Sequence, residues 1–209
     1  MRCQINAGSI TAAVDEFFVH GHQYIFPKGL SVRITAFQAA KSCRNKPTHQ
    51  ISCRDGFVQI GDGVLCIGGK IPYTSWAEFE KFIKQIVNSL SQSSLINQVE
   101  LVKLRYLNFY TENIFDSINL NISMKGINNI CSGSTVFRTE IPCMENIIGV
   151  LQITNGVHVK NESLELDNDG SLIDIQTLVK NVSLENWLDA VQKLHEQVES
   201  LFIKLTRKE

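Results

Sequence analysis

The residues that could do chemistry are few, and the first is an arginine in a strand-like segment. Residues 99–110 are dense in β-branched and aromatic side chains, which is typical of a strand. Alternation along that strand places Arg105 on one face and Tyr106 and Asn108 on the other. An arginine on a sheet face can hold a carboxylate or phosphate through two parallel hydrogen bonds. We expect Arg105, with Tyr106 or Asn108, either to anchor an anionic ligand or to form a structural ion pair, for instance with Asp174.

The second candidate is a histidine in a helical segment near the C-terminus. His195 follows Leu194, at the border of an apolar stripe. A role in acid–base catalysis would require Asp174 or Glu165 within about 3 Å of it, or one water away. The alternative is a histidine at the edge of the core with a hydrogen-bond partner. No residue is assigned as catalytic, and Asp174 and His195 are kept as candidate ligand-binding residues.

Metal and cofactor sites have no support in the sequence. His20 and His22 would share one face of a strand, but no third ligand can be identified. Residues 167–170 (DNDG) resemble part of a calcium loop, yet the required glutamate does not follow, so they predict a turn. The glycine patterns of phosphate-binding loops and dinucleotide-binding folds do not occur. We therefore expect no metal and no cofactor.

The cysteines and the first residues bear on the cellular compartment. Six cysteines occur, without a C-x-x-C pair, and the first residues contain no apolar segment of signal-peptide length. In a reducing compartment such cysteines are usually small buried side chains. The sequence therefore predicts a cytoplasmic protein without disulfides.

Composition excludes several classes of protein. The chain has 209 residues, of which 44% are hydrophobic and 20% charged, a balance typical of a folded globular protein. Its 20 Lys and Arg against 21 Asp and Glu give a net charge of −1, so no general attraction to nucleic acid is expected. No apolar run approaches the roughly 20 residues that span a membrane. Neither nucleic acid nor a membrane is an expected partner.

The first half of the chain contains three short strands and a helix. Residues 49–54, 57–60 and 64–69 have strand composition and are separated by glycine–aspartate turns, which predicts an antiparallel meander. Ser75 and Glu78 have the spacing of a helix-capping box. The apolar residues from Trp76 to Leu90 follow at helical spacing.

The second half repeats this order with longer elements. Residues 99–110 and the alternating segment 118–124 predict strands, and Asn155-Gly156 and Asp169-Gly170 predict hairpin turns. A long amphipathic helix should begin after the capping residue Ser183, with its apolar face formed by Trp187, Val191, Leu194, Val198, Phe202 and Leu205.

Strands followed by a helix, twice, predict an α+β fold of antiparallel sheets with two covering helices. Trp76 and Trp187 occupy similar places at the starts of the two helices, which suggests a duplicated unit of a strand block and a helix. No linker of distinctive composition divides the halves. We therefore expect one two-lobed domain over residues 1–209, with halves at about 1–95 and 96–209.

Several separated motifs resemble a known family. The segments are PYTSWAEFEKFIKQI, with Tyr73, Trp76 and Phe79; LRYLN, at 104–108; SLIDIQ, at 171–176; and LDAVQKLHEQVESLFIKLT, with Leu194, His195 and Phe202. Over about residues 57–206 they resemble a sporadically distributed family of uncharacterised bacterial and archaeal proteins. The resemblance implies no established reaction. The patchy distribution of the family implies a role in mobile-element or phage-defence systems.

Three functional hypotheses follow, in order of preference. The first is a non-enzymatic binding protein whose partner is another protein, encoded nearby, or a second copy held through the C-terminal helix. The second is a sensor of a small molecule or nucleotide, with the anionic ligand held by Arg105. The third is a hydrolase-type enzyme that uses His195 with Asp174 or Glu165.

Overall fold

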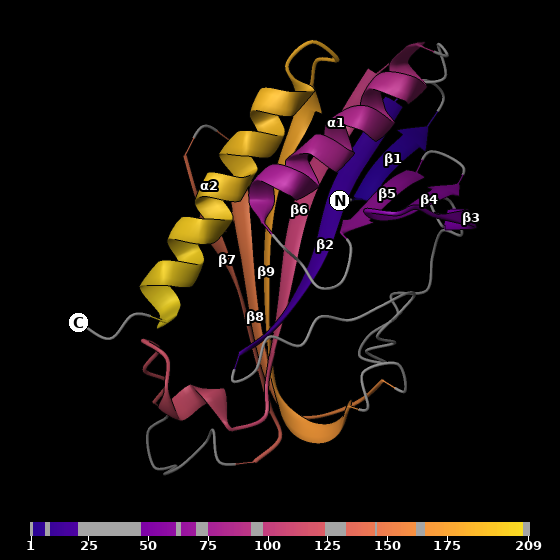
Figure 1. The fold of residues 1–209 in the computed structure, drawn as a ribbon. Coiled ribbons are helices and arrows are strands. Elements are labelled where there is room, and N and C mark those ends of the chain that lie inside the picture. The colour runs from indigo at the N-terminus through magenta and orange to yellow at the C-terminus, as the bar shows by residue number, and fades with distance from the viewer. Residues whose placement is uncertain are drawn as a thin grey trace.

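The structure is a computed structural model that describes residues 2–6, 9–20, 47–61, 64–69, 75–92, 98–123, 133–144, 146–161 and 166–206. The described strands follow the order β3-β4-β5-β1-β2-β6-β9-β8-β7 (Figure 1). Two antiparallel blocks, β3-β4-β5 and β6-β9-β8-β7, are joined through β1 and β2.

The first block is the predicted meander. Its strands are β3 (Pro47–Ser52), β4 (Gly56–Gly61) and β5 (Val64–Gly69), each antiparallel to the next. The backbone of β1 (Arg2–Asn6) runs antiparallel to β5, and that of β2 (Ser9–His20) runs parallel to both β5 and β6. The predicted meander is therefore confirmed, with Asp55 in the connection between β3 and β4, whereas Asp62 and Gly63 lie outside the described residues.

The second block has longer strands. They are β6 (Gln98–Tyr110), β7 (Thr135–Pro142), β8 (Ile148–Asn161) and β9 (Leu166–Val182). A short 3-10 helix, η1 (Ile114–Asp116), follows β6. Although β6 and β9 are far apart in sequence, they pair in register from Val99 opposite Val182 to Tyr110 opposite Ser171. This pairing brings the central residues of the candidate site together.

Both helices cover the same face of the sheet and lie side by side (Figure 1). Helix α1 (Trp76–Gln92) begins where the capping pattern predicted, because the Glu78 N–H donates to Ser75 Oγ at 3.3 Å. Helix α2 (Trp187–Thr206) begins later than predicted. The hydroxyl of Ser183 instead accepts a hydrogen bond from the Asn186 N–H, at 3.3 Å, and stabilises a turn that precedes the helix.

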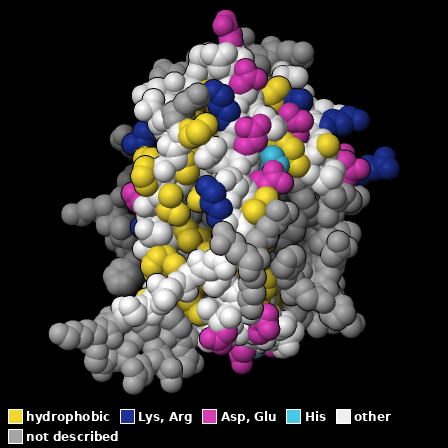
Figure 2. Space-filling view, turned by 90° about the vertical axis from the view of Figure 1, so that its left-hand side faces the viewer, with side chains coloured by type: hydrophobic (Ala, Val, Ile, Leu, Met, Phe, Trp, Pro, Cys, Tyr) yellow, Lys and Arg dark blue, Asp and Glu magenta, His cyan; other side chains and the backbone are white. Residues whose placement is uncertain are grey.

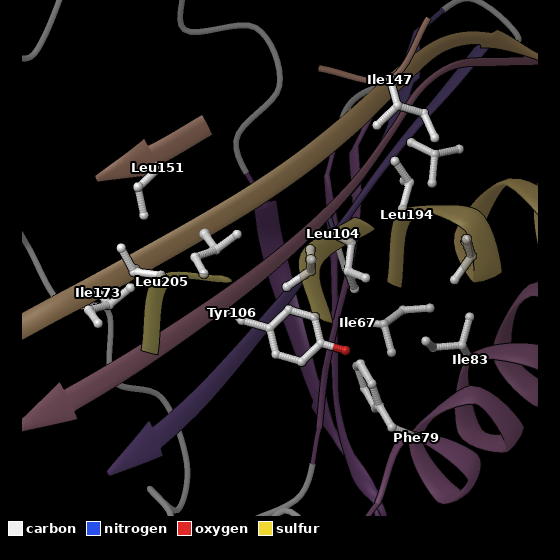
Figure 3. Close-up of a cluster of buried hydrophobic side chains, with 14 of the residues drawn as sticks. Ile67, Phe79, Ile83, Leu104, Tyr106, Ile147, Leu151, Ile173, Leu194 and Leu205 are labelled. Atoms are coloured by element: carbon white, nitrogen blue, oxygen red, sulfur yellow. The ribbon is translucent and has the colours of Figure 1, made fainter. Parts of the chain in front are cut away.

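The core lies between the helices and the sheet (Figure 3). One cluster of buried side chains includes Ile67 of β5, Ile83 of α1, Leu104 of β6, Ile173 of β9 and Leu194 of α2. Residues from both halves of the chain thus share one cluster. The apolar face predicted for the last helix is confirmed, since its side chains pack in or against this core.

The hairpin turn predicted at Asn155-Gly156 is wrong. Strand β8 continues through this pair, and its register with β9 shifts there, as in a β-bulge. Gly156 has a φ of 73°, a backbone conformation that residues with a side chain rarely adopt. The bulge therefore requires glycine at this position, although the chain does not turn. The Asn155 side chain is buried, bonds to the Gly133 carbonyl at 3.1 Å and lies 2.9 Å from Ser171 Oγ.

The turn predicted at Asp169-Gly170 is also wrong, because both residues lie within β9 opposite β8. A Cβ atom at Gly170 would lie 1.9 Å from the carbonyl oxygen of Tyr110 and 2.8 Å from the ring of Phe109. The glycine therefore permits close approach of two strands rather than a reversal of the chain.

The strand predicted at 118–124 does not form over its described part, 118–123. Ile118 is buried in the core, and the Asn119 backbone N–H donates to the Leu205 carbonyl at 2.7 Å. The Asn119 side chain donates to the Lys204 carbonyl at 3.2 Å. The alternation of apolar and polar residues arises because the segment caps the C-terminal end of α2 while its apolar side chains enter the core.

The α+β class, with antiparallel strand blocks and two covering helices, is confirmed. The duplication is not confirmed. No described helix is long and apolar enough to cross a membrane.

Candidate functional site

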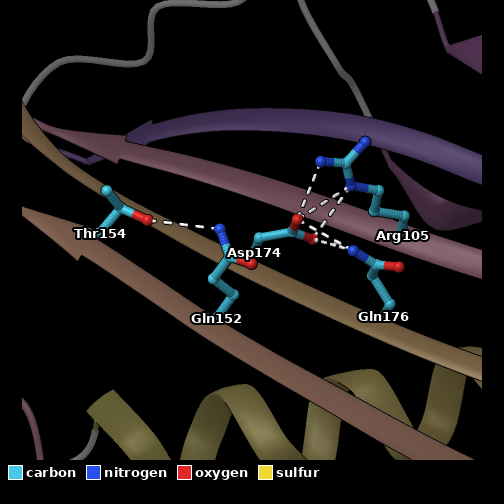
Figure 4. A network of polar contacts seen from close by, with 5 residues as sticks. All are labelled: Arg105, Gln152, Thr154, Asp174 and Gln176. Atoms are coloured by element: carbon cyan, nitrogen blue, oxygen red, sulfur yellow. Dashed lines mark hydrogen bonds and ion pairs between the residues drawn. The ribbon is translucent and has the colours of Figure 1, made fainter. Parts of the chain in front are cut away.

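Arg105 of β6 forms an ion pair with Asp174 of β9 (Figure 4). Its Nη2 lies 2.8 Å from Asp174 Oδ2, and its Nε lies 3.0 Å from Oδ1. The register of β6 and β9 places Asp174 opposite Leu107, so the two charged side chains meet diagonally across adjacent strands. The expected structural ion pair is thereby confirmed, and Asp174 occupies two donors that an anionic ligand would use.

The carboxylate of Asp174 is surrounded by donors. Its side chain is 4% exposed, whereas that of Arg105 is 24% exposed. Gln176 also donates from Nε2 to both carboxylate oxygens, at 2.9 and 3.0 Å. A buried carboxylate needs such partners to offset the loss of hydration. On β8, Gln152 donates to Thr154 and continues this polar group across the sheet (Figure 4).

Tyr106 points to the opposite face and belongs to a second group. Its hydroxyl lies 2.6 Å from Nδ1 of His195 on α2. The imidazole stacks on the indole of Trp76, at the start of α1, with ring centroids 3.9 Å apart and planes 10° apart. The Trp76 Nε1–H donates to Gln192 at 2.8 Å, and Gln192 in turn donates to Glu196 at 3.1 Å. This group connects the sheet to both helices.

The surroundings of His195 favour the neutral imidazole. Burial lowers the pKa of His195 from its ordinary value, and this effect exceeds the opposing influence of Glu199, Glu196 and Glu80. A neutral ring with Nδ1 unprotonated accepts the hydrogen bond from the Tyr106 hydroxyl. The expectation of a histidine at the edge of the core with a hydrogen-bond partner is confirmed.

The five candidate residues therefore do not form one site. Arg105 and Asp174 lie on the face of the sheet away from the helices, while Tyr106 and His195 lie on the helix side. Asn108 is 4% exposed and shares the strand parity of Tyr106. The predicted pairing of His195 with Asp174 in acid–base catalysis is wrong, because alternation along β9 turns Asp174 to the face away from the helices, whereas His195 of α2 lies on the helix side. Glu165 lies outside the described residues.

The remaining histidines and cysteines considered from the sequence form no metal site among the described residues, and some of them lie outside those residues. The described part of the chain contains no group of three or more His, Cys, Asp or Glu suited to a metal ion. His20 lies in β2, for which only the backbone is described, and His22 lies outside the described residues. Cys53 and Cys143 are free thiols, Cys66 is buried, and the side chains of the other cysteines are not described. Burial raises the pKa of Tyr110 to about 12, so its phenol remains protonated at neutral pH.

Strand β7, which the sequence analysis does not predict, presents an exposed surface. It lies at the end of the order of described strands, and its residues alternate between half-buried and exposed. Val136 is 60% exposed, and Arg138 and Glu140 are exposed beside it on the same face. The period-two pattern of TVFRTEIP, with Phe137, Thr139 and Ile141 between these residues, is the signal that could have identified the strand.

Exposed apolar side chains extend this surface. Ile148, at the start of β8, and Met144, in the connection from β7, are 38% and 67% exposed. On the side of the molecule that carries α2 and β7, hydrophobic side chains lie between acidic and basic ones (Figure 2). We call Val136, Arg138, Glu140, Met144 and Ile148 the β7 edge.

Comparison with protein-family models, with curated proteins and with solved structures gives no match for this chain. The resemblance to a sporadically distributed family stays a prediction.

Proposed function

We propose that this protein is a non-enzymatic binding protein that recognises a protein partner through the β7 edge. The observation that supports this is the outer face of β7, where exposed Val136 lies beside Arg138 and Glu140 at the end of the described sheet. A strand in this position offers backbone donors and acceptors to an added strand, and its side chains provide selectivity.

The chemistry of the β7 edge favours an extended protein segment over a small molecule. Its exposed face mixes apolar and charged side chains, as the centre and rim of protein interfaces do. The ion pair of the β7 edge, Arg138 with Glu140, is exposed, whereas the polar groups on the two sides of β6 are largely buried and bonded to one another: Arg105 with Asp174, and Tyr106 with His195. A ligand anchored on Arg105 would have to compete with a buried carboxylate.

A role as a component or regulator of a mobile-element or phage-defence system belongs to the same proposal. Its support is the resemblance to the sporadically distributed family. In that setting the partner would be either a protein encoded nearby or a second copy of this chain.

Site-specific crosslinking tests the proposal. A photoreactive residue at Val136, in the full-length protein produced in its own host, should crosslink to one protein at fixed stoichiometry, through an extended segment of that protein. The matched control carries the same residue at Asn88, which is exposed on α1 and should give no such product. Equal products from both positions, or none from Val136, would contradict a binding role for the β7 edge.

A backbone variant strengthens the test. Arg138→Pro removes a backbone N–H from the edge strand, so it should abolish the crosslink if the partner binds by strand addition. A crosslink of unchanged yield would show that the partner does not bind as an added strand.

A further inference from the structure

The backbone of β7 has a defined outer side. The Cys143 N–H, one residue beyond the strand, donates to the Ile147 carbonyl at 2.9 Å. The register of β7 with β8 is unbroken from Thr135 opposite Asn155 to Pro142 opposite Ile148. Because hydrogen-bonding sides alternate along an antiparallel strand, residues of the same parity as Cys143 bond to β8. The N–H and C=O groups of Val136, Arg138 and Glu140 therefore point away from β8.

The charges on this strand are complementary to themselves. Arg138 and Glu140 are two residues apart on the same face, and within one chain they form an ion pair of 3.6 Å with side chains 54% and 63% exposed. An ion pair this exposed contributes little by itself, so both side chains can turn to a second chain. If a second copy of β7 lies antiparallel to the first with Thr139 opposite Thr139, Arg138 of each copy faces Glu140 of the other. Each of these pairs also exchanges both backbone hydrogen bonds, because their N–H and C=O groups point outward.

The remaining positions fit the same register. Phe137 of one copy faces Ile141 of the other on the helix side, and both side chains are only partly buried by their own subunit. Val136 faces Pro142, which accepts one hydrogen bond through its carbonyl but has no N–H to donate. Proline thus ends the ladder at the same place in both copies, and no like charges face each other within it.

We propose that the β7 edge binds a second copy of this chain, so that two antiparallel β7 strands, related by a two-fold axis at Thr139, join two sheets into one. A two-fold interface requires a surface complementary to itself, and the order of charges on β7 meets that requirement. The edge strand β3 fits less well, because a register irregularity between Pro47 and His49 interrupts its pairing with β4. This inference rests on the proposed function and names its partner.

Charge reversal at the two exposed residues tests the pairing. Arg138→Glu makes both positions acidic, and Glu140→Arg makes both basic, so each variant should dimerise at least about tenfold more weakly than the wild type. The double variant R138E/E140R restores opposite charges in the same register and should dimerise like the wild type. Both side chains are exposed, so folding of the variants should be retained.

Mixing the two single variants gives the sharpest result. At both contacts between the strands, an acidic side chain of the R138E chain would face a basic side chain of the E140R chain. A heterodimer should therefore form where neither variant forms a homodimer. Sedimentation equilibrium and native mass spectrometry at micromolar concentration measure both species. Charge reversal at Glu80 and Lys84, an ion pair on α1, provides a control that should leave dimerisation unchanged.

The outcomes separate this inference from the proposed function. A wild-type protein that remains monomeric at these concentrations overturns self-pairing, and so do single variants that dimerise as tightly as the wild type. If the crosslink from Val136 then reaches a different protein, the binding function stands and the second copy is excluded. A crosslink from Val136 to β7 of a second copy, together with the heterodimer, supports both the binding function and the self-pairing.

Discussion

Replacement of Arg105 by leucine tests whether the Arg105–Asp174 pair stabilises the fold. The variant removes the cation but keeps an apolar side chain in its place. The Asp174 carboxylate, 4% exposed, would then retain only the Gln176 amide among its side-chain partners described above. Removal of one partner from a buried pair typically costs about 3–5 kcal/mol, because the other charge is left buried without compensation.

The reciprocal variant should cost less. In Asp174→Leu the guanidinium of Arg105 loses its carboxylate, but the side chain is 24% exposed and can be hydrated. We expect a loss of about 1.5–3 kcal/mol, the range of a hydrogen bond to a charged group. The double variant R105L/D174L leaves no buried charge at this position and should lie within about 2 kcal/mol of the wild type.

Urea unfolding of the four proteins, followed by circular dichroism at pH 7, gives the coupling free energy from a double-mutant cycle. We expect a coupling of at least about 2 kcal/mol, since the residues contact each other directly. A loss below about 1 kcal/mol for Arg105→Leu would refute the reasoning, because that value is typical of a pair screened by solvent.

Two further predictions concern the backbone and the second polar group. Gly170→Ala should destabilise the protein by about 3 kcal/mol or more in urea unfolding, because the new Cβ would lie 1.9 Å from the Tyr110 carbonyl oxygen. The control is Gly133→Ala, whose new Cβ would have no neighbour within 4 Å. It should change the free energy of unfolding by less than about 0.5 kcal/mol. Similar losses for both would argue against close approach at Gly170. The unfolding free energy of the wild type should fall as pH drops below about 6.5, because burial lowers the pKa of His195 in the folded state and the unfolded chain binds the proton first. His195→Gln should remove this part of the pH dependence below about pH 6.5, and an unchanged slope there would contradict the assignment.

Patterns with strong local causes were read correctly from the sequence. The strand segments separated by glycine and aspartate form the β3-β4-β5 meander, and the spacing of Ser75 and Glu78 marks the start of α1. Alternation along β6 correctly separated Arg105 from Tyr106, because side chains on a strand project to opposite faces whatever the strand pairs with.

The glycines of β8 and β9 led to wrong turn predictions, because glycine is used both in tight turns and at positions within strands that have no room for a side chain or need a positive φ. Gly156 adopts a positive φ at a bulge, and Gly170 admits a neighbouring strand, yet both occur in dipeptides typical of hairpin turns. A local pattern cannot distinguish these uses, since the deciding atoms belong to strands elsewhere in the chain.

The sequence by itself determined the class of fold, the two helices with their apolar faces, and the side of β6 on which each candidate residue lies. Only the tertiary structure decided that Asp174 is the partner of Arg105, that His195 contacts Tyr106 and Trp76, and that β7 ends the described sheet. The physical reason is that periodicity and capping depend on residues a few positions apart. Ion pairs, stacking and strand order depend instead on which distant segments pack together, and that is settled by the burial of the whole core.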